Sequence, residues 1–304
     1  MSNFETITFI DLRLDYAFKL VFGTPGNEDL LLKLINAILP ERHFASVRLS
    51  TNERVGQRPA SRRAIYDIFA TTSDGSDVTI EMQFGDQDDF NQRMVFYSSF
   101  PIQNHVLKGE ESYTFPNVYV IGITDFILKA VPSNDDMINQ YAVINKKHQG
   151  IPLCDQLTFV TVELPKLKKG LTDLETGADF MLYAIRNIGE MNGIPKEFDG
   201  KGLDKLFELC KFANMTIEEQ REYLAVFMAE RDEKSRMRTA INTGLERGRT
   251  EGRSQGRAEG RAEGRAEGRA EATRDNARNL KSLGVDPAII SKATGLTADE
   301  ISAL

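Results

Sequence analysis

Hydrophobic positions between residues 13 and 39 recur at the intervals of an α-helix. They form two sets, separated by the sequence Gly-Thr-Pro-Gly: Leu14, Phe18 and Val21, and then Leu30, Leu31, Leu34, Ile35 and Ile38. Residues three and four positions apart share one face of a helix, whereas Gly and Pro interrupt it. The pattern therefore predicts two short helices.

The segments that follow have the composition of β-strands. Residues 45–51, 64–72 and 76–84 are rich in β-branched and aromatic residues and end at turn-forming ones. A helix is expected from about Phe90 to Leu107, and the nearly all-apolar run 117–124 is typical of a strand buried on both faces. The predicted order is helix, three strands, helix, strand, which places the chain in the α/β class.

Beyond residue 155 the pattern changes from strand to helix. Residues 156–164 predict one more strand, and 172–240 indicate several helices that pack on the core or form a surface for a partner. The chain then divides into four segments: a core at 1–165, a helical extension at 166–243, a four-residue repeat at 244–272 and a small helical tail at 273–304.

The repeat brings back Gly, Arg and mostly Glu at every fourth position. On a helix this places like charges one turn apart, as at Arg261 and Arg265, and each glycine costs about 1 kcal/mol relative to alanine. Glycines four residues apart nevertheless form a smooth seam along which two helices approach closely, and a partner chain supplies the opposite charges. The repeat is compatible with a flexible linker and with an oligomerising helix.

The tail contains two helix start signals. Asp286 precedes Pro287, and Thr297 is followed three residues later by Glu300, the spacing of a capping box. The resulting helical pair has little positive charge to offer DNA. A docking element is therefore favoured over a DNA-binding helix-turn-helix.

The composition excludes several classes of protein. The 304 residues are 41% hydrophobic, and no apolar run approaches the roughly 20 residues of a membrane span. The N-terminal residues lack the basic and apolar regions of a secretory signal, so a cytoplasmic protein without membrane contact is expected. Cys154, Cys210 and three scattered histidines provide neither a disulfide framework nor a histidine-based metal motif.

The net charge of −7 argues against a protein that coats nucleic acid nonspecifically. Residues 41–63 depart from this mean, because six arginines against two glutamates give a local charge of +4. This segment is either a phosphate-facing surface or a solvated basic loop. The arginines are Arg42, Arg48, Arg54, Arg58, Arg62 and Arg63.

The strongest chemical signal is a predicted hairpin with Asp67 on one strand and Glu81 and Gln83 on the next. A two-residue loop at 74–75 would send Asp67 to the opposite face from Glu81, whereas a three-residue loop at 74–76 pairs Asp67 with Gln83. The hydrophobic alternation favours the second arrangement, or a loop of the same parity. The apolar residues then share one face: Ile68, Ala70, Val78, Ile80 and Met82.

Two carboxylates on one face of a hairpin suit a hard divalent cation. Mg²⁺ or Mn²⁺ binds one or two carboxylates together with waters and substrate phosphate. We expect Asp67 and Glu81 as ligands, with the backbone carbonyl of Met82 as a third. The alternative is a polar sheet surface that faces solvent.

Several ordered motifs resemble the recombination-promoting nuclease and transposase family, a branch of the PD-(D/E)XK phosphodiesterases. The motifs are DYAFKLVFG, LLLKLINAIL, YDIFATTSDGSDVTIEMQ and QRMVFYSS, and the resemblance covers roughly residues 8–125. It implies a restriction-endonuclease-like core of helix, three antiparallel strands, helix and strand, with a helical C-terminal extension. That order agrees with the one predicted above.

The resemblance also implies roles for individual residues. Asp67 and Glu81 match the acids of the motif, while Gln83 stands where the motif usually has Lys. A neutral amide binds water or phosphate but carries no charge, so Arg93 or Lys19 would supply it. Three further residues have two interpretations each: Asp15 is an acid near the metal or a helix N-terminal acid, and Arg93 and Tyr97 contact phosphate or pack at the edge of the core.

Three functions are compatible with these observations. The first is a metal-dependent DNA endonuclease whose breaks promote recombination or transposition, with RNA as an alternative substrate. The second is a module of the same fold that binds DNA or a partner without cutting. The third is an interaction protein that forms homo-oligomers through the repeat at 244–272.

Overall fold

The computed structural model describes residues 7–50, 53–54, 64–65, 67–85, 88–105, 113–129, 135–148 and 150–304. The chain forms two compact units, Met1–Arg231 and Asp232–Leu304. Of the basic segment predicted at 41–63, the side chains of Arg42 and Arg48 are described, and those of the other four arginines lie outside the described residues. Among the described helices, none is both long and apolar enough to cross a membrane.

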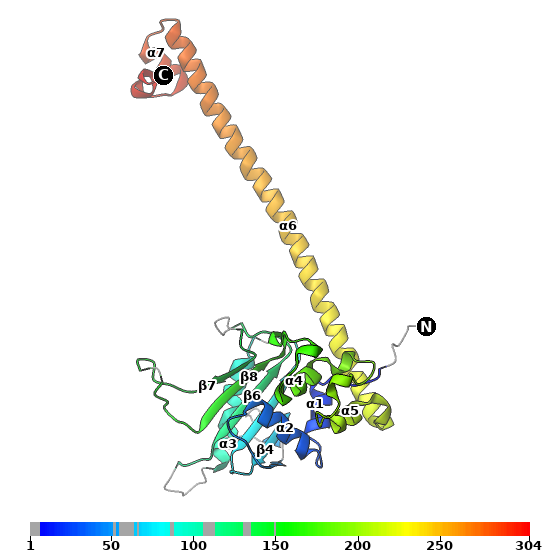
Figure 1. Cartoon of the computed structure of the whole chain (residues 1–304). Helices are drawn as coiled ribbons and strands as arrows, with labels where there is room; N and C mark the ends of the chain where they lie inside the picture. The colour runs from blue at the N-terminus through cyan, green and yellow to red at the C-terminus, as the bar shows by residue number, and fades with distance from the viewer. Residues whose placement is uncertain are drawn as a thin grey trace. The chain divides into compact units, whose positions relative to one another are not determined.

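A six-stranded sheet with the order β1-β4-β5-β6-β8-β7 forms the centre of the first unit (Figure 1). Strands β1, β4 and β5 are antiparallel, β5, β6 and β8 are parallel, and β7 is antiparallel at the edge. The strands are β1 Val47–Leu49, β4 Ile68–Thr72, β5 Asp77–Gln83, β6 Val118–Thr124, β7 Ile138–Tyr141 and β8 Leu157–Glu163. A separate pair joins β2 Glu53–Arg54 to β3 Ala64–Ile65.

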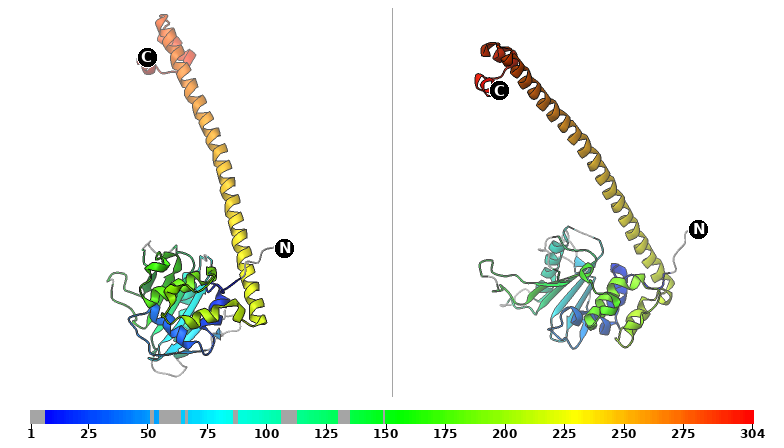
Figure 2. Two further views of the ribbon diagram at one scale, coloured as in Figure 1. Left: turned by 45° about the vertical axis from the view of Figure 1, so that its right-hand side comes forward. Right: turned by 45° about the horizontal axis from the view of Figure 1, so that its top comes forward.

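One face of this sheet packs against helices from both ends of the first unit. The two predicted N-terminal helices occur as α1 Asp15–Phe22 and α2 Glu28–Ile38. They share a hydrophobic core with α4 Gly177–Asn187 and α5 Asp204–Cys210, and the right-hand view of Figure 2 shows the N-terminal and these later helices on the same side of the sheet. Of the helices predicted within 172–240, α4 and α5 therefore pack on the core. Short 3₁₀ turns connect them: η1 Leu164–Lys166, η2 Leu171–Asp173, η3 Ile188–Glu190, η4 Lys196–Phe198 and η5 Phe212–Asn214.

Helix α3, Phe90–His105, covers the opposite face of the sheet. Phe90 and Met94 pack on Val118 and Val120 of β6, in a cluster separate from the main core. Strands β5 and β6 are consequently buried along their whole length. The polar face of the hairpin is therefore not a solvent-facing sheet surface.

The register of the hairpin differs in detail from the prediction. Ile68 pairs with Ile80 and Thr71 with Asp77, so continuing the register by one residue places Asp67 opposite Glu81 rather than Gln83. The turn begins one residue earlier than predicted, because Thr72 donates its N–H to the carbonyl of Ser76 at 2.9 Å. Both registers have the same parity. The predicted apolar face is confirmed, since all five of its residues belong to the main core.

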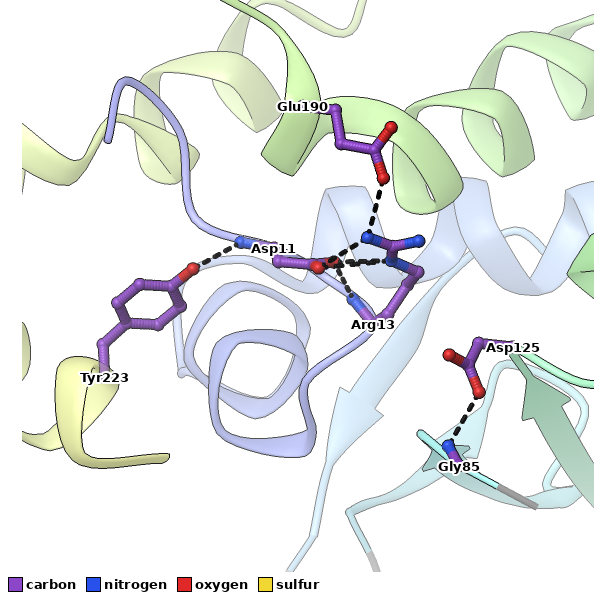
Figure 3. Close-up of polar contacts among 6 residues, drawn as sticks. All are labelled: Asp11, Arg13, Gly85, Asp125, Glu190 and Tyr223. Carbon is purple, nitrogen blue, oxygen red and sulfur yellow. Dashed lines mark hydrogen bonds and ion pairs between the residues drawn. The ribbon is translucent and has the colours of Figure 1, made fainter. Parts of the chain in front are cut away.

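The segment before α1 is attached to residues far along the chain. The N–H of Ile10 donates to the carbonyl of Cys210 at 2.8 Å, and the N–H of Asp11 donates to the hydroxyl of Tyr223 at 3.0 Å. Arg13 donates to both carboxylate oxygens of Asp11 and to Glu190, as Figure 3 shows. These contacts fix the chain just before the helix that contributes Asp15 and Lys19.

Helix α4 begins with a capping box in which Asp179 is the acidic partner. Thr176 accepts a hydrogen bond from the N–H of Asp179, and Asp179 accepts from the N–H of Thr176 and from Lys169 at 2.9 Å each. Burial works to raise the pKa of Asp179, but these hydrogen bonds outweigh it and lower the pKa to about 2.

The lowered pKa predicts a pH-dependent contribution to stability. A carboxyl whose pKa is lower in the folded state stabilises the fold above its unfolded pKa, and this contribution is lost as the pH falls towards the folded value. We expect Asp179→Asn to lower the free energy of unfolding at pH 6. The difference in this free energy between the variant and wild type should become smaller between pH 4 and pH 3. Urea titrations of both proteins at each pH measure the difference, and a difference that does not change with pH would contradict the expectation.

The second unit consists of most of helix α6, Ile217–Ser282, with α7 Pro287–Thr294 and α8 Ala298–Ser302. The segment 244–272 is helical throughout. Both predicted helix starts are confirmed, with Asp286 and Thr297 as the capping residues. Ile290 and Ile301 pack on Ala277 of α6, which makes the tail a docking element.

Candidate active site

A cavity of about 370 Å³ lies at the junction of α1, β5 and α3. All eight residues singled out from the sequence line it: Asp15, Lys19, Asp67, Glu81, Met82, Gln83, Arg93 and Tyr97. Leu14, Phe84 and Glu230 are the other described residues of the lining. The fold thus brings together predicted residues that are up to 82 positions apart in the sequence, from Asp15 to Tyr97.

Asp67 immediately precedes β4 and is only 7% exposed. One carboxylate oxygen accepts the N–H of Met82 at 2.6 Å, and the other contacts the Lys19 ammonium at 2.9 Å. Burial raises the pKa of Asp67, although Lys19 and the Met82 N–H favour the charged form and oppose this shift. The side chain is therefore held in one orientation by groups on two other elements.

Glu81 lies in the middle of the buried strand β5 and is 4% exposed. One of its oxygens accepts the N–H of Asp67 at 3.3 Å, and the other is 4.0 Å from the guanidinium of Arg93. Burial, and next the negative charge of Asp67, raise the pKa of Glu81 well above its usual value. Two neighbouring acids that resist ionisation together are typical of sites that bind a cation.

Lys19 and Asp15 contribute to the cavity from α1. The ammonium of Lys19 is 3.7 Å from the Asp15 carboxylate, one turn earlier on the helix. Burial works to lower the pKa of Lys19, but the charge and hydrogen bond of Asp67 together with the charges of Asp15 and Glu81 outweigh it, and the pKa is raised. Asp15 also accepts the N–H of Tyr16 at 2.6 Å. Both interpretations of Asp15 have support, since it begins a helix and also lines the cavity.

Gln83, Arg93 and Tyr97 form the opposite wall. The amide oxygen of Gln83 accepts a hydrogen bond from the guanidinium of Arg93, and its amide nitrogen donates to the carbonyl of Phe84. Arg93 also lies 6.0 Å from the centre of the Tyr97 ring. Burial, and then Glu81, raise the pKa of Tyr97. The residue at the position of the motif lysine therefore orients an arginine, and among the described residues the cavity has one cation from α1 and one from α3.

The donor set fits a divalent cation of the Mg²⁺ type. The two buried carboxylates face one cavity, and such a cation needs only one or two carboxylates because waters and phosphate complete its shell. Among the described residues no three His, Cys, Asp or Glu side chains converge as a fully protein-bound metal site would require.

Sequence reasoning missed three lining residues. Phe84 follows β5 and packs under the guanidinium of Arg13, whose carbon lies 5.8 Å from the ring centre. The chain beyond it is held where Asp125 accepts the N–H of Gly85 at 2.7 Å, as Figure 3 shows. Glu230, on α6, is more than 130 residues from any predicted site residue, and no spacing pattern connects it to them.

Gly122 sets the distance between α3 and the sheet. It lies beside Glu81 in the parallel register, and a Cβ atom there would be 2.7 Å from the Phe90 ring and 2.9 Å from the sulfur of Met94. We expect Gly122→Ala to destabilise the fold by about 1–3 kcal/mol through overpacking. Thermal unfolding measures this, with Gly193→Ala as a control because nothing lies within 4 Å of its added Cβ. Equal melting temperatures for the two variants would contradict the close approach.

A core of two helices, three antiparallel strands, a helix and a parallel strand, with an Asp–Glu pair on the central hairpin, defines a nuclease-like protein of the PD-(D/E)XK type. The family model described as PD-(D/E)XK nuclease family transposase matches residues 12–240. The chain belongs to this family, as its sequence motifs predicted. No curated protein and no solved structure matches it.

Proposed function

We propose that this chain is a metal-dependent DNA endonuclease and that Asp67, Glu81 and Lys19 are at its catalytic centre. The observation that supports the proposal most is the pair of buried carboxylates in a cavity that also contains two cations. A protein that uses such acids only for structure gains nothing from burying them together, because each raises the cost of ionising the other. Breaks made by this activity promote recombination or transposition.

The reaction is the hydrolysis of a phosphodiester. A water oxygen forms a bond to phosphorus, the bond between phosphorus and the leaving oxygen breaks, and the leaving oxygen gains a proton. Asp67, Glu81 and the Met82 carbonyl would hold Mg²⁺ or Mn²⁺, which would supply positive charge at the phosphate and make a water molecule easier to deprotonate. Lys19 orients the attacking water, since its ammonium is 2.9 Å from the carboxylate of Asp67.

Arg93 and Tyr97 bind the phosphate oxygens. The guanidinium of Arg93 is aligned by Gln83 and lies next to Glu81, so its charge is directed into the cavity. A guanidinium suits this role because it donates several hydrogen bonds in a fixed plane. Asp15, which contacts Lys19, positions that lysine from the same helix.

Cleavage of supercoiled plasmid tests the proposal. We expect the purified protein to nick the plasmid with Mg²⁺ or Mn²⁺ and to stop when EDTA is added. The variants Asp67→Asn and Glu81→Gln are expected to be inactive, while Asp155→Asn, an exposed acid outside the cavity, keeps wild-type activity. Equal behaviour of all four proteins would refute catalysis at this site and favour a binding module, and a parallel assay on single-stranded RNA distinguishes the substrate.

A further inference from the structure

The helical repeat offers a large surface that the fold does not cover. Every residue from 232 to 272 is exposed within the second unit. In each complete Gly-Arg-Ala-Glu unit of residues 256–271, Arg and Glu are two residues apart and therefore lie on opposite sides of the helix. Like charges instead stand one turn apart, so the helix has no stabilising pattern of its own. A partner with the complementary charge pattern would therefore stabilise it.

Exposed apolar side chains lie on α6 just before the repeat. Met237, Ile241, Gly244 and Gly248 are spaced by four, three and four residues, which places them on one face of α6. Met237 is 53% exposed and Ile241 is 56% exposed. Such spacing of exposed apolar residues is typical of a helix that packs on another helix. The glycines continue this face through the repeat.

When two such helices pack through their glycines, their charges are complementary in a parallel pair but not in an antiparallel pair. With about 100° per residue, each Arg lies about 100° to one side of the preceding Gly and each Glu about 60° to the other. When two such helices pack in parallel through their glycines, the Arg side of each meets the Glu side of the other. In an antiparallel pair, Arg would face Arg and Glu would face Glu.

We propose that α6 pairs in parallel with α6 of a second copy of this chain, through a face that begins at Met237 and Ile241 and continues along the glycines to Gly268. Because four residues exceed one turn of 3.6, this face rotates by about 40° per repeat, and a period longer than 3.6 gives a right-handed crossing. The glycines permit the close approach that this crossing needs. The inference is independent of the proposed nuclease activity.

Two full-length variants with altered charges test whether the partner of α6 is a second copy of the chain. The acidic variant carries Arg→Glu at Arg257, Arg261, Arg265 and Arg269, and the basic variant carries Glu→Arg at Glu259, Glu263, Glu267 and Glu271. We expect wild type to have twice the monomer mass in sedimentation equilibrium at 50 mM NaCl. Each variant alone should be a monomer, and an equimolar mixture should recover the dimer mass. A monomeric wild type, or variants that remain dimers alone, would overturn the proposal.

Crosslinking tests the parallel orientation. In a Cys154→Ser background, Met237→Cys places a thiol on the proposed face, and Ala258→Cys places one on the opposite side of the helix. Oxidation is expected to join two copies through residue 237 at least tenfold faster than through residue 258. Equal rates would overturn the parallel pairing. A different outcome, in which wild type is a monomer and the acidic variant loses affinity for a duplex oligonucleotide, would assign the Arg side to DNA and refute pairing.

Discussion

Lys19→Gln is expected to slow DNA cleavage by about 10²- to 10³-fold, the usual cost of removing one donor aimed at a reacting group. The amide of glutamine can still donate a hydrogen bond to Asp67, so the variant keeps the contact that holds this acid. What it loses is the positive charge. Single-turnover experiments measure the cleavage step, and the DNA affinity measures binding. We expect the cleavage rate to fall, and not the affinity.

Two further variants show whether the effect is specific to Lys19. Lys33→Gln is the matched control, because Lys33 lies on the neighbouring helix α2 and its ammonium contacts the carbonyl of Gly202, away from the cavity. Adding Gln83→Lys to Lys19→Gln returns a cation to the position of the family motif, and we expect part of the rate to return. A Lys19→Gln protein that cleaves as fast as wild type would show that this lysine has no catalytic role.

Glu81→Gln is expected to abolish cleavage and at the same time to stabilise the fold without metal. Burial and the neighbouring Asp67 raise the pKa of Glu81, so the folded state disfavours its charged form. An acid of this kind destabilises the protein above its unfolded pKa, and the penalty disappears as the pH falls below it. Glutamine has nearly the same shape and removes the charge.

Urea unfolding at pH 8 and pH 4, in EDTA, measures this gain. The stability difference should be large at pH 8 and small at pH 4. Adding Mg²⁺ at pH 8 should stabilise wild type more than the variant, since only wild type retains both carboxylates. A variant less stable than wild type at pH 8 would contradict the proposed electrostatic cost of the site.

Much of the fold follows from local patterns. The alternation of Ile68, Ala70, Val78, Ile80 and Met82 determined which face of the hairpin is buried, because a slip by one residue would expose them. The exact pairing of β4 with β5 could not be predicted from this alternation, since a three-residue turn can begin at residue 73 or 74 without changing which face is buried. Asp74 favours the turn that begins at residue 73, because it accepts hydrogen bonds from the Thr72 hydroxyl and the Ser76 N–H.

The candidate site was predictable to the extent that its residues lie on elements with clear periodicity. Asp15, Lys19, Arg93 and Tyr97 each lie on a helix whose position was predicted, and the family motifs identified which side chains to consider. That Gln83 would orient Arg93 required the geometry of α3 on the sheet. Glu230 and the edge strand β7 were not predicted, because each depends on contacts between distant segments that leave no local pattern.

The attachment of the N-terminal segment has a consequence for the order of events during synthesis. Residues 8–13 emerge from the ribosome early, but their partners Glu190, Cys210 and Tyr223 are made more than 170 residues later. Contacts between such distant segments form late in folding. The final position of helix α1, which contributes Lys19, therefore depends on segments up to Tyr223, and the proposed active site is complete only after these segments have been made.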